Sequence, residues 1–173
     1  GLLLARQQRF DEAEPHFLAG LEVLGSTRYE QQKRALLLSG LANLYRRSGQ
    51  AARAVPLYGE ALAIQRRHQQ RSAEGIFLNN LGLTYTALEQ HEDARRTLSE
   101  ALESARESGS RRTESILLGN LAALEVDLDE RLRLVQQGHQ LSLGTDDRNA
   151  TLIALRKLCL LYTSDAADEV VGV

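Results

Sequence analysis

The chain has 173 residues, with 21 Lys and Arg against 23 Asp and Glu, which gives a formal net charge of −2 at pH 7. This balance and a hydrophobic content of 43% exclude collagen-like, mucin-like and disordered chains, and they argue against binding of nucleic acid or a membrane surface through bulk electrostatics. Two prolines, no Trp and a single Cys exclude a disulfide framework and a thiolate metal cluster, and they favour long helices over a turn-rich β fold.

The first predicted element is the second helix of an incomplete unit at residues 1–24. The spacing Ala13-x-x-x-Phe17-x-x-Gly20-Leu21 places small and apolar residues on one helical face. The chain contains no Met and opens at Gly1 inside this helical pattern, so we expect it to be a fragment of a longer protein. In the linker Gly25-Ser26-Thr27, Gly can end one helix in a left-handed conformation, while Thr27 and Glu30 have the spacing of a capping box.

Two complete units follow, at about 35–68 and 75–108. In the first, Leu38-x-x-Leu41-Ala42-x-x-Tyr45 precedes Ala54-x-x-x-Tyr58-x-x-Ala61-Leu62, and the same spacing recurs 40 residues later with similar residue types. Both blocks have helical periodicity, so we predict two antiparallel helices in each unit. Small residues recur where these helices would meet and allow close packing, while Pro15 and Pro56 share one repeat position near the start of the second helix. The small residues are Ala42, Gly82 and Ala122 on the first helices and Ala13, Ala54 and Ala94 on the second.

A degenerate unit is expected at about 115–143, because Leu118-x-x-Leu121-Ala122-x-x-Glu125 repeats only the first block. The acidic cluster of Asp127, Asp129 and Glu130 is interpreted as a polar break between its two helices. A further partial unit is expected to begin at about residue 151, near Leu152.

The last residues raise a question of origin. The run Cys159-Leu160-Leu161-Tyr162-Thr163-Ser164-Asp165-Ala166-Ala167-Asp168-Glu169 resembles a translated transposase adapter used in DNA library preparation. We therefore expect residues 1–158 to form the native array and residues 159–173 to be a non-native, adapter-derived tail. The alternative is a native helix start, since Leu155, Leu158, Cys159 and Tyr162 also have helical spacing.

The repeat pattern resembles a known family. The order Leu-x-x-Leu-Gly-x-x-Tyr from Leu78, followed by Ala-x-x-x-Leu-x-x-Ala from Ala94, is similar to the tetratricopeptide repeat, in the longer subtype of kinesin light chains and bacterial signalling regulators. The resemblance covers most of residues 1–143 and implies an all-α fold, a right-handed α-solenoid of antiparallel helical hairpins. A HEAT-like solenoid is the alternative, but the small residues recurring on both helices favour the tetratricopeptide interpretation.

The two helices of each unit differ in the side turned away from the apolar stripe. The second helices carry charges there, among them Arg53, Glu60, Arg66 and Glu100, which predicts a solvated outer surface. The first helix of the 75–108 unit is uncharged on that side, where Ile76, Asn79, Asn80, Leu83, Thr86 and Ala87 lie. Such a side is either packed or turned toward a partner, and in a stacked array the first helices line the concave face.

We therefore expect a peptide or a partner helix to bind on the first helices. Amide side chains donate and accept hydrogen bonds and can hold a peptide backbone irrespective of its sequence, as the resemblance to long-repeat relatives with Asn ladders also implies. The alternatives are that the Asn side chains bond only to a neighbouring unit or to water, and that the arginines, offered as a carboxylate-binding rim, are merely solvated. The candidate residues are Asn43, Arg46, Arg47, Asn79, Asn80, Leu83 and Asn120.

Catalytic chemistry has no support in the sequence. The 13 glycines form no phosphate-binding loop, and the four histidines never pair at i, i+4. We predict no catalytic, cofactor-binding or metal-binding residues, no nucleic-acid or membrane partner, and a cytoplasmic location, which the single Cys favours. The predicted function is a non-catalytic protein–protein interaction module. The alternative is the regulatory arm of a larger bacterial signalling ATPase, kinase or transcription regulator.

Overall fold

The computed structural model describes residues 10–143, without the side chains of residues 71 and 72. The expected partial unit from about residue 151 and the tail at 159–173 lie outside the described residues. Within 10–143 the chain forms seven helices and no strand. The helices are α2 (Phe10–Glu22), α3 (Arg28–Arg47), α4 (Ala51–Arg67), α5 (Arg71–Ala87), α6 (His91–Glu107), α7 (Arg111–Ala122) and α8 (Leu128–Leu143).

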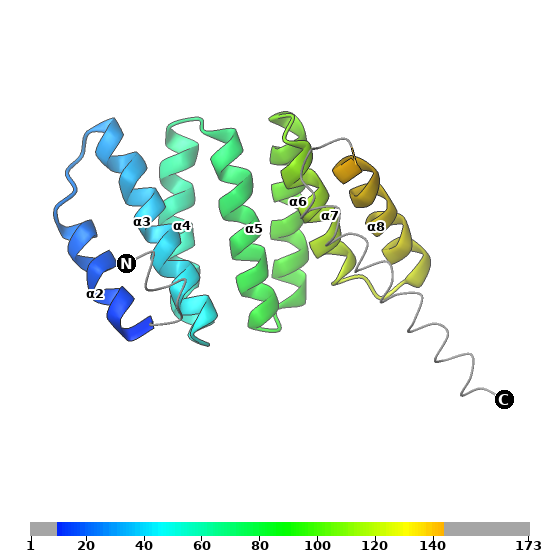
Figure 1. Cartoon of the computed structure of the whole chain (residues 1–173), viewed down its shortest axis with the longest axis horizontal. Helices are drawn as coiled ribbons and strands as arrows, with labels where there is room; N and C mark the ends of the chain where they lie inside the picture. The colour runs from blue at the N-terminus through cyan, green and yellow to red at the C-terminus, as the bar shows by residue number, and fades with distance from the viewer. Residues whose placement is uncertain (1–9, 144–173) are drawn as a thin grey trace. The chain divides into compact units, whose positions relative to one another are not determined.

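The chain divides into two compact units, Gly1–Ser104 and Ala105–Val173, and each is described by itself. In the first unit the helices lie side by side in chain order (Figure 1). Helix α3 packs against α2 and α4, α4 packs against α5, and α3 also reaches α5. In the second unit α7 packs against α8. The architecture is the all-α array of helical hairpins that the repeat pattern predicts.

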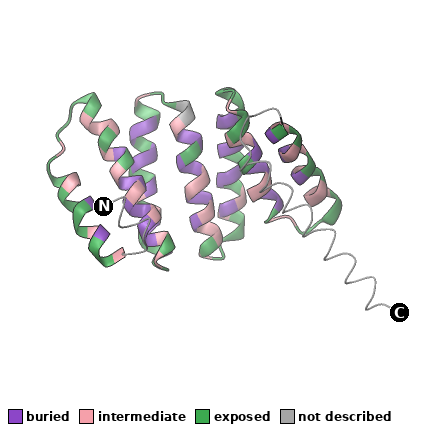
Figure 2. Cartoon of the chain, viewed as in Figure 1, coloured by how far each residue is buried: buried purple, intermediate pink, exposed green. Residues whose placement is uncertain are grey.

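Close contacts at the small residues hold the hairpins together, as predicted. A Cβ atom placed on Gly82 of α5 would lie 2.6 Å from Cγ of Leu98 and 3.5 Å from the carbonyl oxygen of Ala94, both on α6. Ala94 and Leu98 are fully buried, and so are Ala54 and Tyr58 at the equivalent positions of α4. Figure 2 shows the buried positions recurring along α4 and α5. The small residue on one helix therefore leaves the space that a large residue of the next helix fills.

The helix ends follow the predicted signals in part. The capping box is confirmed: the backbone N–H of Glu30 donates to Thr27 Oγ1 at 3.3 Å, and the Glu30 carboxylate accepts from the Thr27 backbone N–H at 3.0 Å. Gly109 has the expected left-handed conformation, with φ +66°. Gly25 does not belong to the left-handed set; a Cβ there would lie 2.9 Å from Glu30 Oε2, so glycine leaves room for the capping carboxylate. The expected side-chain cap from Ser110 is wrong, because its hydroxyl bonds to Thr113 Oγ1 instead.

The prolines lie deeper in their helices than their sequence position suggests. Pro15 and Pro56 are each the sixth residue of their helix, α2 and α4, and both are exposed. A proline at this depth has passed the first turn, where the missing N–H would cost nothing, so each helix gives up one backbone hydrogen bond. The prediction of a place near the helix start is therefore only approximate.

The degenerate unit forms a hairpin whose details differ from the prediction. Helix α7 ends at Ala122, so Glu125 lies in the linker instead of the helical stripe and accepts hydrogen bonds from Arg131 through its carbonyl oxygen. Asp127 Oδ1 accepts from the Glu130 backbone N–H at 2.8 Å and so caps α8, whose first turn holds the two other acidic residues of the cluster. The packing contact is Gly138, whose carbonyl oxygen accepts from the Ser115 hydroxyl at 2.6 Å.

Candidate functional site

The predicted binding residues of the first compact unit lie on one side of α3 and α5, which we call the first-helix face. Its residues are Leu36, Asn43, Arg46 and Arg47 on α3, and Ile76, Asn79, Asn80 and Leu83 on α5. The two helices are in contact, and Leu36 and Ile76 occupy the same repeat position, 40 residues apart. Leu36 is 62% exposed and Ile76 47% exposed. Large apolar side chains thus remain open to solvent on neighbouring helices.

The uncharged side of α5 is not packed away. Asn79, Asn80 and Leu83 are half-buried and Ile76 is exposed, so residues 10–143 leave this side of the helix partly uncovered. The amide of Asn80 makes no hydrogen bond within the described part of the chain, and its backbone carbonyl accepts from Thr84 Oγ1 at 2.8 Å. Asn79 already has an interaction partner. Asn80 is therefore the amide of this face that is ready to bind a ligand.

The two arginines of the face have different surroundings. Arg46 donates from Nη2 to Asn43 Oδ1 at 3.2 Å, while its Nε is buried without a hydrogen-bond partner in the described residues. Burial raises the pKa of the neighbouring Tyr58 to about 12, and the nearby charge of Arg46 opposes that shift. Arg47 is exposed, with its guanidinium 6.0 Å from the ring centroid of Phe10. Arg46 thus lies partly inward, and Arg47 is the more accessible cation.

Asn120, the remaining predicted residue, belongs to the second compact unit. It lies half-buried on α7 and already has an interaction partner. Ala123, Val126 and Asp127, which have the spacing to extend the same stripe, lie beyond the end of α7 because that helix stops at Ala122.

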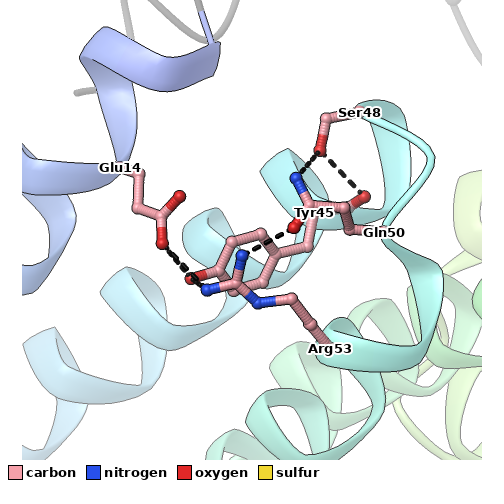
Figure 3. Close-up of polar contacts among 5 residues, drawn as sticks. All are labelled: Glu14, Tyr45, Ser48, Gln50 and Arg53. Atoms are coloured by element: carbon pink, nitrogen blue, oxygen red, sulfur yellow. Dashed lines mark hydrogen bonds and ion pairs between the residues drawn. The ribbon is translucent and has the colours of Figure 1, made fainter.

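A polar network fixes the end of α3 next to this face (Figure 3). Tyr45 donates from its hydroxyl to Glu14 Oε1 at 2.6 Å, and Arg53 Nη2 donates to the same carboxylate oxygen at 2.9 Å. The Arg53 guanidinium also lies 3.9 Å from the centroid of the Tyr45 ring. The hydrogen bond from Tyr45, together with Arg53, lowers the pKa of Glu14. Three successive helices, α2, α3 and α4, are joined in this way.

Ion pairs also connect successive helices, and the sequence interpretation missed them. Arg66 at the end of α4 donates from Nε to Glu74 Oε1 at 2.7 Å and from Nη2 to Glu100. The bond to Glu74 is the main reason why the pKa of Arg66 is raised. Forty residues on, Arg106 Nε donates to Glu114 Oε1 at 2.8 Å. These residues are largely exposed, apart from Glu74, which is 5% exposed, so an outer surface predicted as solvated is also a set of inter-helix contacts.

The described residues contain no group of three or more His, Cys, Asp or Glu side chains placed to hold a metal ion. Among the helices between residues 10 and 143, none combines the length and the apolar character that crossing a membrane requires.

Comparison with protein families gives two matches, both to the tetratricopeptide repeat, over residues 1–67 and 77–108. Comparison with curated proteins gives no match.

Solved structures give clear matches to the fold. BtubC (BKLC) from P. vanneervenii superposes with a TM-score of 0.77 at 20% identity, over 95% of this chain and 69% of that one. A putative kinesin light chain with nearly identical TPR-like repeats from Podosopora anserina gives a TM-score of 0.70 at 18% identity, over 96% and 83% of the two chains. A point variant of that same protein gives a TM-score of 0.72 at 18% identity over the same shares.

Proposed function

The chain belongs to the tetratricopeptide repeat family, whose repeats generally mediate protein–protein interaction, and from that premise we propose that its first-helix face binds a peptide segment of a partner protein. The observation that carries the proposal is the uncharged and partly uncovered side of α5, flanked by the exposed side chains of Leu36 and Ile76. Nothing in this arrangement calls for a reacting group, and binding is the whole of the proposed activity.

Two kinds of contact support a peptide as the ligand. The exposed apolar side chains of Leu36 and Ile76 gain stability when a partner side chain covers them. The free amide of Asn80 can donate to a peptide carbonyl and accept from a peptide N–H, which favours an extended backbone as the ligand. Arg47, at the end of α3, adds a cation that would favour a partner with an acidic residue at that end.

The proposal is tested by selecting binding peptides from a displayed library of random dodecapeptides on the full chain. Affinities of the selected peptides are then measured for the wild type, Asn80→Ala and Ile76→Ser. We expect each substitution to weaken binding about three- to tenfold, the loss of one or two hydrogen bonds or of about half an isoleucine's burial. Helicity by circular dichroism should stay unchanged, since neither residue is buried.

Val23→Ser is the matched control, because Val23 is a β-branched residue that is 80% exposed in the linker between α2 and α3. It should leave peptide affinity unaltered. Peptides that bind Ile76→Ser and Asn80→Ala as tightly as the wild type would place the binding surface elsewhere and remove the proposal.

A further inference from the structure

The second compact unit has a hollow that the proposed function does not use. It has a volume of about 380 Å³ and is lined by parts of α6, α7 and α8. Five of the lining residues are polar, and the other two are leucines. The polar residues are Arg106, Arg111, Glu114, Gln137 and Gln140.

This hollow lies on a different side of α7 from the predicted binding residue Asn120. Arg111, Glu114 and Leu118 follow one another at intervals of three and four residues, so they share one helical stripe. The stripe of Ile116 and Asn120 is offset from Leu118 by two residues, which turns it to the opposite side of the helix. A ligand in the hollow would therefore not compete with one bound on the first helices.

Internal comparison of the repeats shows what the hollow lacks. In the first compact unit the guanidinium of Arg66 is held by two carboxylates, Glu74 on its Nε and Glu100 on its Nη2. Arg106 is the equivalent of Arg66, 40 residues on, and its Nε bonds to Glu114 in the same way. The equivalent of Glu100 is Gln140, which carries no charge and lines the hollow. The carboxylate on the outer edge of the arginine is thus missing from this repeat.

The charges in the hollow are correspondingly unbalanced. Glu114 neutralises one of the two arginines, and Arg111 has no side-chain partner within residues 10–143. The lining therefore carries one formal positive charge in excess. A guanidinium presents planar pairs of N–H donors that match a carboxylate, and the amides of Gln137 and Gln140 add further donors.

We propose that this hollow binds one carboxylate group of a peptide, in the place that Glu100 occupies in the preceding repeat. Arg111 and the outer edge of Arg106 hold the carboxylate oxygens, and the Gln140 amide donates to one of them. The carboxylate can come from an acidic side chain or from a chain terminus, and the experiment below separates the two sources.

The test titrates the full chain, labelled with ¹⁵N, with two blocked peptides and follows the side-chain resonances of Arg106, Arg111 and Gln140. The first peptide is tri-glutamate with acetylated and amidated ends, and the second is acetylated tri-glutamine with a free C-terminal carboxylate. Saturable shifts of these resonances with the first peptide assign the site to a side-chain carboxylate, and with the second to a terminal one. Absence of shifts with both peptides overturns the proposal.

Two variants make the test specific. Arg111→Gln should weaken binding about tenfold, the usual effect of losing a charge-assisted hydrogen bond. Gln140→Glu restores the carboxylate that the preceding repeat has, so it should weaken binding at least as much by occupying the site. Gln136→Glu adds the same charge at an exposed position of α8 outside the hollow, and it should leave affinity within about twofold.

An equal effect of Gln140→Glu and Gln136→Glu would show that only overall charge matters, and the proposal would then fail. None of these residues belongs to the first-helix face, so the outcome is independent of the library selection. Loss of selected peptides in Ile76→Ser with no shifts in this titration would uphold the proposed function and reject the hollow.

Discussion

Replacing Gly82 with Ala tests whether the spacing of α5 and α6 is set by the absence of a side chain at this position. The added Cβ would lie 2.6 Å from Cγ and 2.7 Å from Cδ2 of Leu98. The Cγ atom is close to the backbone, and Leu98 is fully buried, so its side chain has no free space into which to move. The helices must shift apart or Leu98 must leave its preferred rotamer.

The expected size of the effect follows from two opposing terms. Alanine in place of glycine stabilises a helix interior by about 1 kcal/mol. Overpacking of a filled core costs about 1–3 kcal/mol, so the net result for Gly82→Ala is a destabilisation of about 1 kcal/mol. Gly59→Ala is the matched control, because Gly59 lies inside α4 and a Cβ there would meet no atom within 4 Å. This control should be stabilised by about 1 kcal/mol, since only the propensity term acts.

Urea denaturation followed by circular dichroism measures the free energy of unfolding of both variants. The difference between them isolates the overpacking cost, because the helix-propensity gain is common to both. In a Leu98→Ala background, Gly82→Ala should become as stabilising as Gly59→Ala, since the clashing atoms are gone. If Gly82→Ala stabilises the wild-type chain as much as Gly59→Ala does, the close packing of these two helices is not what the glycine provides.

Two further predictions concern buried or paired tyrosines. Tyr58→Phe should unfold at the same or a slightly higher urea concentration, because it removes a buried hydroxyl that has no hydrogen-bond partner in the described residues. Because burial raises the pKa of Tyr58 from 10.0 to about 12, the wild type should lose stability as pH rises through that window, and Tyr58→Phe should lose less; equal losses in both chains would contradict the assigned cause. Tyr45→Phe removes the donor that chiefly lowers the pKa of Glu14, so NMR titration should find that carboxyl closer to its ordinary 4.5. The Glu14 contribution to stability, present above that pH and lost as the pH falls through the lowered value, should shrink with it, and an unchanged titration curve would argue against the Tyr45 bond.

The periodic part of the fold could be predicted because each repeat states its contacts in residue size. Gly82 and Leu98 are complementary in volume, and the same pairing of small and large residues recurs in each unit, so the hairpins follow from spacing alone. The capping box of Thr27 and Glu30 was also predictable, because it depends on residues three apart.

The parts that could not be predicted depend on residues far apart in the sequence. Arg66 reaches Glu74 and Glu100 only after the helices have packed, and long side chains on an exposed surface give no periodic signal of their partners. Gly138 lies outside the repeat positions used by the other units, so the packing of α7 on α8 was hidden by the degenerate sequence. For the candidate site, the sequence identified the uncharged stripe, but which of its amides is engaged became visible only from the contacts of Asn79 and Asn80.

The charged seams between hairpins make the repeats distinguishable parts with a fixed order. Arg34 pairs with Glu60 inside the α3–α4 hairpin, whereas its equivalent 40 residues on is Glu74, the acceptor for Arg66. If the hairpins were shuffled so that α3–α4 followed α5–α6, Arg106 would meet Arg34 where it now meets Glu114. Like charges would then oppose each other at the junction, so recombination among these similar segments is penalised and the present arrangement is the one that closes without repulsion.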